Sequence, residues 1–236
     1  MVDKPGRRKQ KNIPWNKIAA AAVVGLIAVA GGWYAYWNYV YKAPPEYARI
    51  DTTYGAIYVE LFPACAPQTV ANFVSLANSG FYNDLVWHRI VDKPSPFVIQ
   101  TGDNYSRGGL NSTRDKWGFG GTKATVPLEW CGWLHNFAGT LAMAHTTGTT
   151  NSGSQFFINL SNSTSNLSLD GNFTVFGKVI SGMGVVQKIA SSPICQPPTC
   201  PSTWQPDEPL PPVFMNDVVM LTSQQASAVT NSTTTG

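Results

Sequence analysis

Residues 139–160 read GTLAMAHTTGTTNSGSQFFINL, and their pattern indicates the class of fold. An apolar run, Gly139–Ala144, breaks into small polar residues and then closes on a glutamine followed by two adjacent phenylalanines. Residues two apart on a strand face the same side of a sheet, so we expect Gln155 and Phe157 on one face and Phe156 on the other. The stretch therefore predicts strand, loop, strand.

Similar apolar runs on both sides of this stretch predict further strands. They cover two runs around the turn at Tyr54 and Gly55 within residues 49–62, and then residues 85–91, 97–101, 125–128, 175–180 and 213–222. Helices are expected only at 67–80, which starts with a proline and ends with a glycine, and at about 183–190. Many strands without alternating helices favour a mainly β fold, an antiparallel sheet closed into a barrel of about eight strands with the helices over its ends.

Positive charge is concentrated at the start of the chain. The 236 residues carry a net charge of +3, but residues 1–17 hold six Lys/Arg against Asp3, so residues 18–236 carry −2. A weakly acidic body excludes the basic platform that is typical of nucleic-acid binding. Its 43% share of hydrophobic residues suffices for one sizeable domain.

Residues 18–41 contain no charged side chain. A helix rises about 1.5 Å per residue, so this run can cross an apolar core of about 30 Å. We expect a transmembrane signal anchor here, in contact with the lipid bilayer, and a basic cytoplasmic tail at 1–17. The domain would then lie outside the cytoplasm. A cleaved signal peptide is the alternative, because AVA before Gly31 fits a cleavage site.

The anchor is followed by KAPPEY, which indicates a short stiff linker at 42–48. One domain is expected at 49–223. The polar residues 224–236 are expected to form a disordered tail.

Cysteines and sequons also favour an extracytoplasmic domain. A disulfide could close the short loop between Cys195 and Cys200, and Cys65–Cys131 would be the remaining pair. Zinc is the alternative, although this spacing makes a poor ligand set. Seven Asn-X-Ser/Thr sequons occur, at Asn159 and at the six glycosylation candidates Asn104, Asn111, Asn162, Asn166, Asn172 and Asn231.

Local signatures of the common catalytic sites are missing from the sequence. Ser154 does not stand in a G-x-S-x-G elbow, and no His/Asp/Glu cluster has metal-ligand spacing, so neither a metal nor a cofactor is expected. What is unusual is Arg89 inside an otherwise apolar strand, with Phe97 and Gln100 on the next one. Each of these three residues alone can be explained by a structural role. Together with Gln155 and Phe157, however, they predict an apolar pocket with one fixed cation and amides at its rim.

Several motifs together resemble the cyclophilins, which are peptidyl-prolyl cis-trans isomerases, or rotamases. They are FVIQTGD (97–103), GTLAMA (139–144), NSGSQFFI (151–158) and LDGNFTVFGKVISGM (169–183), after an earlier YGAIYVELF. The resemblance runs in order over roughly residues 48–222. It implies an eight-stranded antiparallel cyclophilin-like β-barrel capped by two α-helices, here preceded by one N-terminal transmembrane helix.

The chemistry of such an isomerase fits these residues. An X–Pro bond turns slowly because amide resonance sets a barrier of roughly 20 kcal/mol, and no nucleophile is needed to lower it. The site needs only to bind the twisted amide better than either planar form. An arginine near the prolyl nitrogen stabilises its lone pair once resonance is lost.

The resemblance also implies roles for single residues. Arg89 would be the catalytic arginine, and Gln100 would orient it and the peptide. The substrate-binding residues would be Phe97, Val98, Phe157, Leu169 and Phe173 around the proline, with Ala144, His145, Thr146 and Gln155 along the neighbouring groove. His145 is expected to contact the substrate backbone, whereas His88 and His135 are interpreted as structural.

The sequence departs from the family pattern near the pocket. The connection between Arg89 and Phe97 is longer than usual and must bulge. Val98 replaces a usual methionine and Phe173 a common histidine. Ser168 stands where animal members carry a tryptophan that favours cyclosporin, so weak drug sensitivity is expected. The Cys195–Cys200 loop and the Pro-rich residues up to 212 exceed the usual connection.

The sequence thus predicts a membrane-anchored isomerase that assists the folding of secreted or membrane proteins by binding their proline-containing segments. The alternative is a catalytically weak cyclophilin-like binding module that acts as an accessory subunit of a membrane protein complex. A serine hydrolase is a distant third hypothesis.

Overall fold

The computed structural model describes residues 28–34, 43–146, 148–195, 198 and 200–233. The chain divides into two compact units, Met1–Lys42 and Ala43–Gly236. In the first, residues 28–34 are helical, and the expected tail at 1–17 and most of the expected anchor at 18–41 lie outside the described residues. Among the helices within the described ranges, none is both long and apolar enough to span a bilayer.

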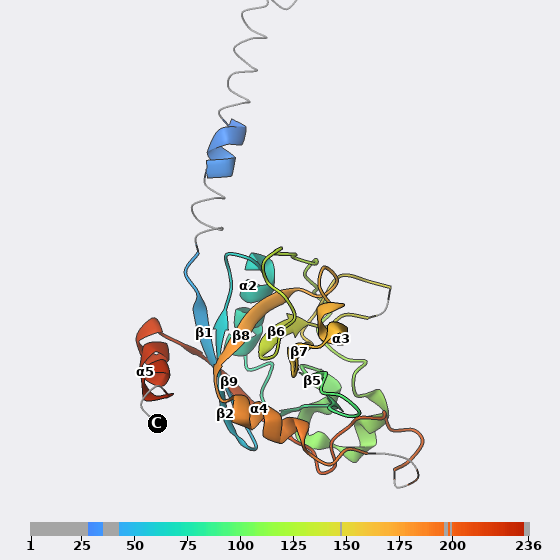
Figure 1. The fold of residues 1–236 in the computed structure, drawn as a ribbon. Helices are drawn as coiled ribbons and strands as arrows, with labels where there is room; N and C mark the ends of the chain where they lie inside the picture. The colour runs from blue at the N-terminus through green and yellow to red at the C-terminus, as the bar shows by residue number, and fades with distance from the viewer. Residues whose placement is uncertain (1–27, 35–42, 147, 196–197, 199, 234–236) are drawn as a thin grey trace, which may run out of the picture. The chain divides into compact units, whose positions relative to one another are not determined.

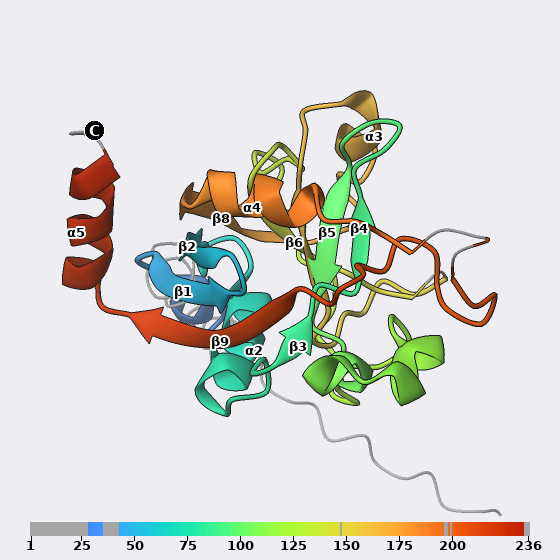
Figure 2. The same cartoon turned by 90° about the horizontal axis from the view of Figure 1, so that it is seen from below.

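The second unit is built on one antiparallel sheet of nine strands (Figure 1). The strands are β1 (Glu46–Thr52), β2 (Gly55–Leu61), β3 (Leu85–Val86), β4 (Arg89–Val91), β5 (Val98–Thr101), β6 (Thr140–Met143), β7 (Phe156–Asn159), β8 (Val175–Ser181) and β9 (Phe214–Leu221). Their spatial order is β3-β9-β1-β2-β8-β6-β7-β5-β4. The edge strands β3 and β4 are joined only by Trp87 and His88, so the sheet must curl back on itself (Figure 2).

The predicted antiparallel fold is confirmed. The predicted count of about eight strands is wrong, because the sheet has nine, and the sheet is not closed into a full barrel, because its end strands β3 and β4 do not pair with each other. The predicted strand 85–91 is two strands, because β3 pairs with β9 whereas β4 pairs with β5. Trp87 and His88 are buried at this corner, where the chain changes partner. The predicted strand 125–128 forms only one isolated bridge, between Val126 and Ser152.

Two helices lie near the predicted positions, α2 (Pro67–Asn78) and α4 (Met183–Ala190). Pro67 starts α2, where its missing N–H costs nothing, and the Glu129 carboxylate accepts hydrogen bonds from the next two backbone N–H groups. The structure adds α3 (Thr164–Leu167), α5 (Ser223–Thr233) and two 3₁₀ segments, η1 (Asn104–Gly109) and η2 (Asn111–Lys116).

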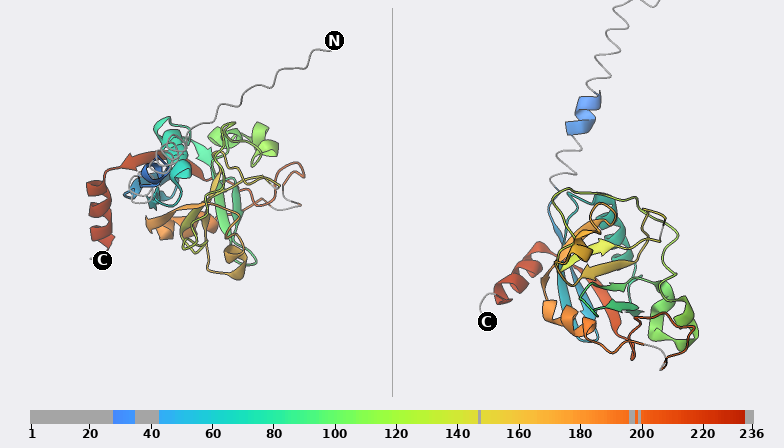
Figure 3. Two further views of the ribbon diagram at one scale, coloured as in Figure 1. Left: turned by 90° about the horizontal axis from the view of Figure 1, so that it is seen from above. Right: turned by 45° about the vertical axis from the view of Figure 1, so that its right-hand side comes forward.

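Helix α5 corrects the expectation of a disordered tail at 224–236. Residues 223–233 are helical and extend beyond the end of β9 (Figure 3). Ala226 is 2% exposed, so the helix has an apolar contact that its polar composition concealed.

The main core lies on the inner face of the sheet, against α2 and α4. Phe73 of α2 stands at its centre, with the rings of Tyr82, Phe176 and Phe156 at 5.2, 5.4 and 5.6 Å. A separate apolar cluster lies on the outer face of β5, β6, β7 and β8. A fold of this size needs only one core, so the second cluster is a candidate pocket.

Both expected disulfides are present, Cys65–Cys131 and Cys195–Cys200. Asn166 is wrong as a glycosylation candidate, because its side chain is fully buried and donates to Phe97 O and Asn159 Oδ1. The sequon Asn159 is equally buried. The other five candidates are exposed: Asn104, Asn111, Asn162, Asn172 and Asn231.

Candidate active site

A single row of outward-facing residues crosses five strands of the sheet. Strand register places Arg89 opposite Gln100, Gln100 opposite Phe157, and Phe157 opposite Ala142. Ala142 in turn lies opposite Val175 of β8. One cation, one amide and three apolar side chains thus follow one another on the same face, as the alternation in the sequence predicted for Gln155 and Phe157.

The apolar part of this row is the second cluster. Val98, Ala142, Phe157 and Val175 are at most 4% exposed and form its floor. Half-buried residues surround them: Val91, Phe97, Leu134, Ala144, Leu169 and Phe173. Phe157 meets Phe173 edge to face at 5.7 Å. The structure therefore brings the predicted residues Phe97, Val98, Phe157, Leu169 and Phe173 together around one apolar floor.

A chain of hydrogen bonds runs from Arg89 along the polar edge of this floor. Arg89 Nη1 donates to Gln100 Oε1 at 3.4 Å, and Gln100 Nε2 donates to Gln155 Oε1 at 2.8 Å. Gln155 Nε2 donates to the carbonyls of Gly118 and Gly120 at 3.0 and 2.8 Å. The three predicted polar residues are thus joined in one network, and a loop that was not predicted closes it.

An open groove of about 530 Å³ continues from the network along β6 and the 118–125 loop. Ala144, His145, Thr146 and Gln155 line it, as predicted. Phe119 lies on its rim with 72% of its surface exposed, and the sequence analysis did not predict this ring as part of the site. The groove leads past small residues, so an extended peptide can lie close to the backbone there.

His145 is held by the protein itself. Its ring stacks on Phe173 at 4.3 Å, and Nε2 is 2.9 Å from the carbonyl oxygen of Asn172. Nδ1 faces Thr146 O at 3.2 Å. The histidine thereby fixes the wall of the pocket that carries Phe173, in addition to the substrate contact expected from the sequence.

The other two histidines are not among the residues that line the groove. Burial lowers the pKa of His88 from 6.5 to about 4, so its ring is neutral near pH 7. His135 Nδ1 lies 2.7 Å from Asp170 Oδ2. Burial alone would raise the pKa of Asp170, but hydrogen bonds from Asn136 and His135 hold it below its ordinary value. The structural roles predicted for both histidines stay predictions.

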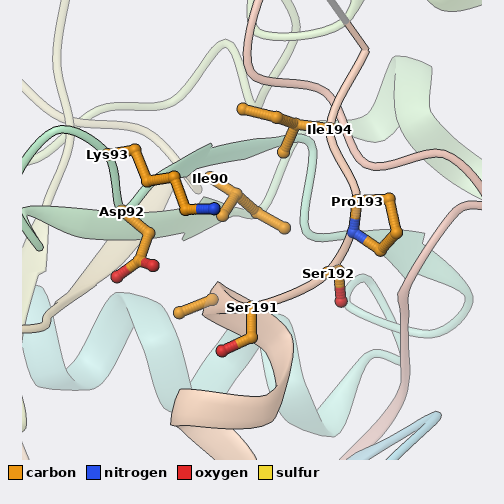
Figure 4. Close-up of a pocket in the computed structure, with 8 residues that line it drawn as sticks. Ile90, Asp92, Lys93, Ser191, Ser192, Pro193 and Ile194 are labelled. Atoms are coloured by element: carbon orange, nitrogen blue, oxygen red, sulfur yellow. The ribbon is translucent and has the colours of Figure 1, made fainter.

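A second hollow, of about 390 Å³, lies behind β4 (Figure 4). Ile90 lines it, and since Ile90 and Arg89 are neighbours on a strand, the hollow is on the face opposite the cation. Asp92 and Lys93 border one side, and residues 191–194 border the other. No Asn or Gln side chain is among the residues that line this hollow, so the outer face of β4–β7 is the stronger candidate for the active site. Within the described residues no cluster of His, Cys, Asp and Glu could hold a metal ion.

Comparison with known families agrees with this geometry. The family model for cyclophilin type peptidyl-prolyl cis-trans isomerases matches residues 47–217. The chain belongs to the cyclophilins. It is a peptidyl-prolyl cis-trans isomerase of that type, and Arg89, Gln100 and Phe157 all lie within the matched segment.

Curated relatives carry the same description. The chain is 40% identical over 141 residues to peptidyl-prolyl cis-trans isomerase-like 1 of Aspergillus niger, across 59% of this chain and 78% of that protein. It is 40% identical over 147 residues to a peptidyl-prolyl cis-trans isomerase of Acinetobacter baylyi, across 61% and 72%. It is 42% identical over 150 residues to peptidyl-prolyl cis-trans isomerase-like 2 of Rhizopus delemar, across 63% of this chain but only 26% of that protein.

A solved structure shows the same fold. The cyclophilin type isomerase of Cryptosporidium parvum superposes with a TM-score of 0.63 at 26% identity, covering 76% of this chain and 99% of that one. A second crystal structure of that protein was obtained in the presence of the dipeptide Ala-Pro.

The structure adds residues to the site that the sequence did not reveal. Ala142 and Val175 complete the pocket floor, and Leu134 reaches it from the loop after the Cys65–Cys131 disulfide. Ala142 and Ala144 are two residues apart in GTLAMA, which is the spacing of side chains on one face of a strand. Nothing in the local sequence, however, indicates which residues of neighbouring strands lie beside that face. Strand pairing alone decides it.

Proposed function

We propose that this cyclophilin isomerises X–Pro bonds by holding the proline ring on the apolar floor and stabilising the twisted amide with Arg89. The observation that supports the proposal is the register, which puts Arg89 one strand from Gln100 and two strands from Phe157. A ring bound over Phe157, Val98 and Ala142 would bring its nitrogen toward the arginine. A guanidinium keeps its charge and offers its donors in a fixed fork.

The network at the polar edge supports the same mechanism. Twisting the X–Pro bond localises a lone pair on the prolyl nitrogen, and a donor already aimed at that place lowers the barrier without further reorganisation. Gln100 Oε1 accepts from Arg89, which holds the guanidinium against the sheet. Because no proton is transferred, the reaction needs no titrating residue in the site.

Replacing Arg89 tests this role. We expect Arg89→Ala to lower kcat/KM by about 10²-fold, as for the loss of one preorganised donor, while the free energy of unfolding changes little because Arg89 is only half-buried. Arg89→Lys should recover a small part, since a point charge lacks the fork. The assay is protease-coupled or proline-limited refolding, with Arg49→Ala on β1 as a control that removes another half-buried arginine. Equal rates for Arg89→Ala and the native chain would exclude this mechanism.

We also propose that the domain works outside the cytoplasm, on a membrane, on proline-containing segments of secreted or membrane proteins. Three features support it: the uncharged run at 18–41, the basic residues before it, and the two disulfides. The solved relative crystallised in the presence of Ala-Pro supports a proline-containing substrate. Full-length chain inserted into microsomes should be carbonate-resistant, with its C-terminal domain protected from added protease. Complete digestion of the domain by the added protease would show that it faces the cytoplasm, contrary to the proposed orientation.

A further inference from the structure

Asp103 is a buried carboxylate beyond the row of site residues. It is 0% exposed, and burial raises its pKa. Among the described residues no Lys, Arg or His forms an ion pair with it. Burying an acid without a cation is costly, so its hydrogen bonds must compensate.

Those hydrogen bonds all come from backbone N–H groups. Oδ1 accepts from Tyr105 N at 2.7 Å, and Oδ2 accepts from Gly118 N and from Gly120 N, the latter at 3.2 Å. A carboxylate only accepts, so it fixes the direction in which these peptides point. The 118–120 loop is thereby held with its N–H groups toward Asp103.

The glycine at 120 leaves the room that this contact needs. A Cβ on Gly120 would lie 2.0 Å from Asp103 Oδ1 and 2.5 Å from Asn104 Oδ1. Any side chain would therefore push the loop off the carboxylate. The glycines of GFGG at 118–121 therefore allow the backbone of the loop to approach the Asp103 carboxylate closely.

The same two glycines present their carbonyls to Gln155. Because Gln155 Nε2 has two hydrogens and both go to these carbonyls, its Oε1 must face the other way, toward Gln100. Gln100 then has to offer its Nε2 to Gln155, which leaves Gln100 Oε1 for Arg89. Without the two carbonyls both amides could turn over together, and Gln100 would then present its NH₂ to the guanidinium.

We propose that Asp103 is a positioning residue for the isomerase reaction: through the 118–120 loop it sets the polarity of the Gln155–Gln100 relay, so that an acceptor oxygen faces Arg89. This inference rests on the proposed role of Arg89. Asp103 touches neither substrate nor Arg89, and it acts only through the relay.

Asp103→Asn tests the proposal with little change in shape. The amide has one acceptor oxygen and no negative charge, so it cannot accept from Tyr105 N and from both glycine N–H groups as the carboxylate does, and its hold on the loop is weaker. We expect kcat to fall about tenfold with KM within about twofold, because the apolar floor still binds proline. The double variant Asp103→Asn with Gln100→Ala should be no slower than Gln100→Ala alone, since both cut one relay. Side-chain amide NMR signals of Gln155 and Gln100 should shift in Asp103→Asn.

Asn104→Ala is the matched control. It removes a hydrogen bond to the same loop, from Gly121 N to Asn104 Oδ1 at 2.6 Å, but leaves the carbonyls that hold Gln155. We expect near-native kcat. If Asp103→Asn does not fold, Gln155→Glu tests the relay, because a carboxylate repels both glycine carbonyls; it too should lower kcat in a way that is not additive with Gln100→Ala.

The outcomes separate the two ideas. If Arg89→Ala leaves the rate unchanged, the mechanism in the previous section fails. If Arg89→Ala is slow but the Asp103→Asn and Gln100→Ala effects multiply, or Asn104→Ala is as slow as Asp103→Asn, the positioning role of Asp103 is overturned and only a structural role is left.

Discussion

Phe156 and Phe157 are neighbours in the sequence but belong to different parts of the protein. Phe156 is 0% exposed in the main core, where it meets the rings of Phe73 and Tyr82 at 5.6 and 5.7 Å. Phe157 lies on the opposite face, in the cluster that includes Val98. The difference follows from strand alternation alone, and it separates stability from function at the scale of one residue.

Alanine at each position should show this separation. Phe156→Ala removes an aromatic ring from a closed core and is expected to cost about 3–5 kcal/mol of unfolding free energy. Phe157→Ala removes a ring from the smaller cluster, whose surrounding residues are only half-buried, so it should cost less stability and should raise KM at least about tenfold. Urea unfolding and the isomerase assay measure the two effects. Equal losses of stability with no change in KM for Phe157→Ala would contradict the assignment.

At the scale of elements, the described part of the segment 192–212 is tethered beside β4. Its carbonyl at Asp207 accepts from Ile90 N, on the strand that carries Arg89. Arg114 of η2 is fully buried between the rings of Trp117 and Trp204, at 4.5 and 4.4 Å. The segment therefore covers the free edge of β4, which would otherwise expose unpaired backbone groups.

The buried pair of Arg114 and Glu208, 3.4 Å apart, makes this tether depend on pH. Burial raises the pKa of Glu208 from 4.5 to about 7. Between these values the folded protein keeps a proton that the unfolded chain releases, so this group lowers the unfolding free energy as pH rises. His88, with its pKa lowered from 6.5 to about 4, acts in the opposite direction over nearly the same range.

Comparison of the native chain with two variants separates the effect of Glu208 on stability from that of His88. From pH 4.5 to 7 the stability of Glu208→Gln should rise relative to that of the native chain, because the variant lacks the group whose proton release weakens the fold. Glu60→Gln, which removes the half-buried carboxylate that pairs with Lys178, serves as a control. The measurement is denaturant unfolding at each pH. A constant offset between Glu208→Gln and the native chain would show that Glu208 titrates normally.

At the scale of the whole molecule, every residue of the candidate site lies in the unit Ala43–Gly236. The strands that carry the pocket, β4–β8, and the 118–120 loop all fall within the family match at 47–217. The second unit therefore contains every residue of the candidate site and the whole of the family match.

Removal of residues 1–42 should leave kcat/KM on a short X–Pro peptide within about twofold of the full-length chain in detergent. The same truncation should move the protein from the membrane fraction to the soluble fraction, because the uncharged run at 18–41 is lost. Activity assays and flotation measure these two properties separately. A soluble full-length chain would contradict the anchor but leave the isomerase assignment intact.

The sequence by itself determined the antiparallel class, the helices at α2 and α4, the split of Phe156 from Phe157 and the residues around Arg89. These features depend on local periodicity and on short motifs, which can be read from residues that are close together in the sequence. It did not determine the corner at Trp87 and His88, because the change of partner from β9 to β5 depends on strands far apart in the chain. It also did not determine the burial of Asn166 or the contact of Asp103 with the 118–120 loop. Those follow only when the curled sheet brings distant segments together, since a buried polar group takes its partners from wherever the fold supplies them.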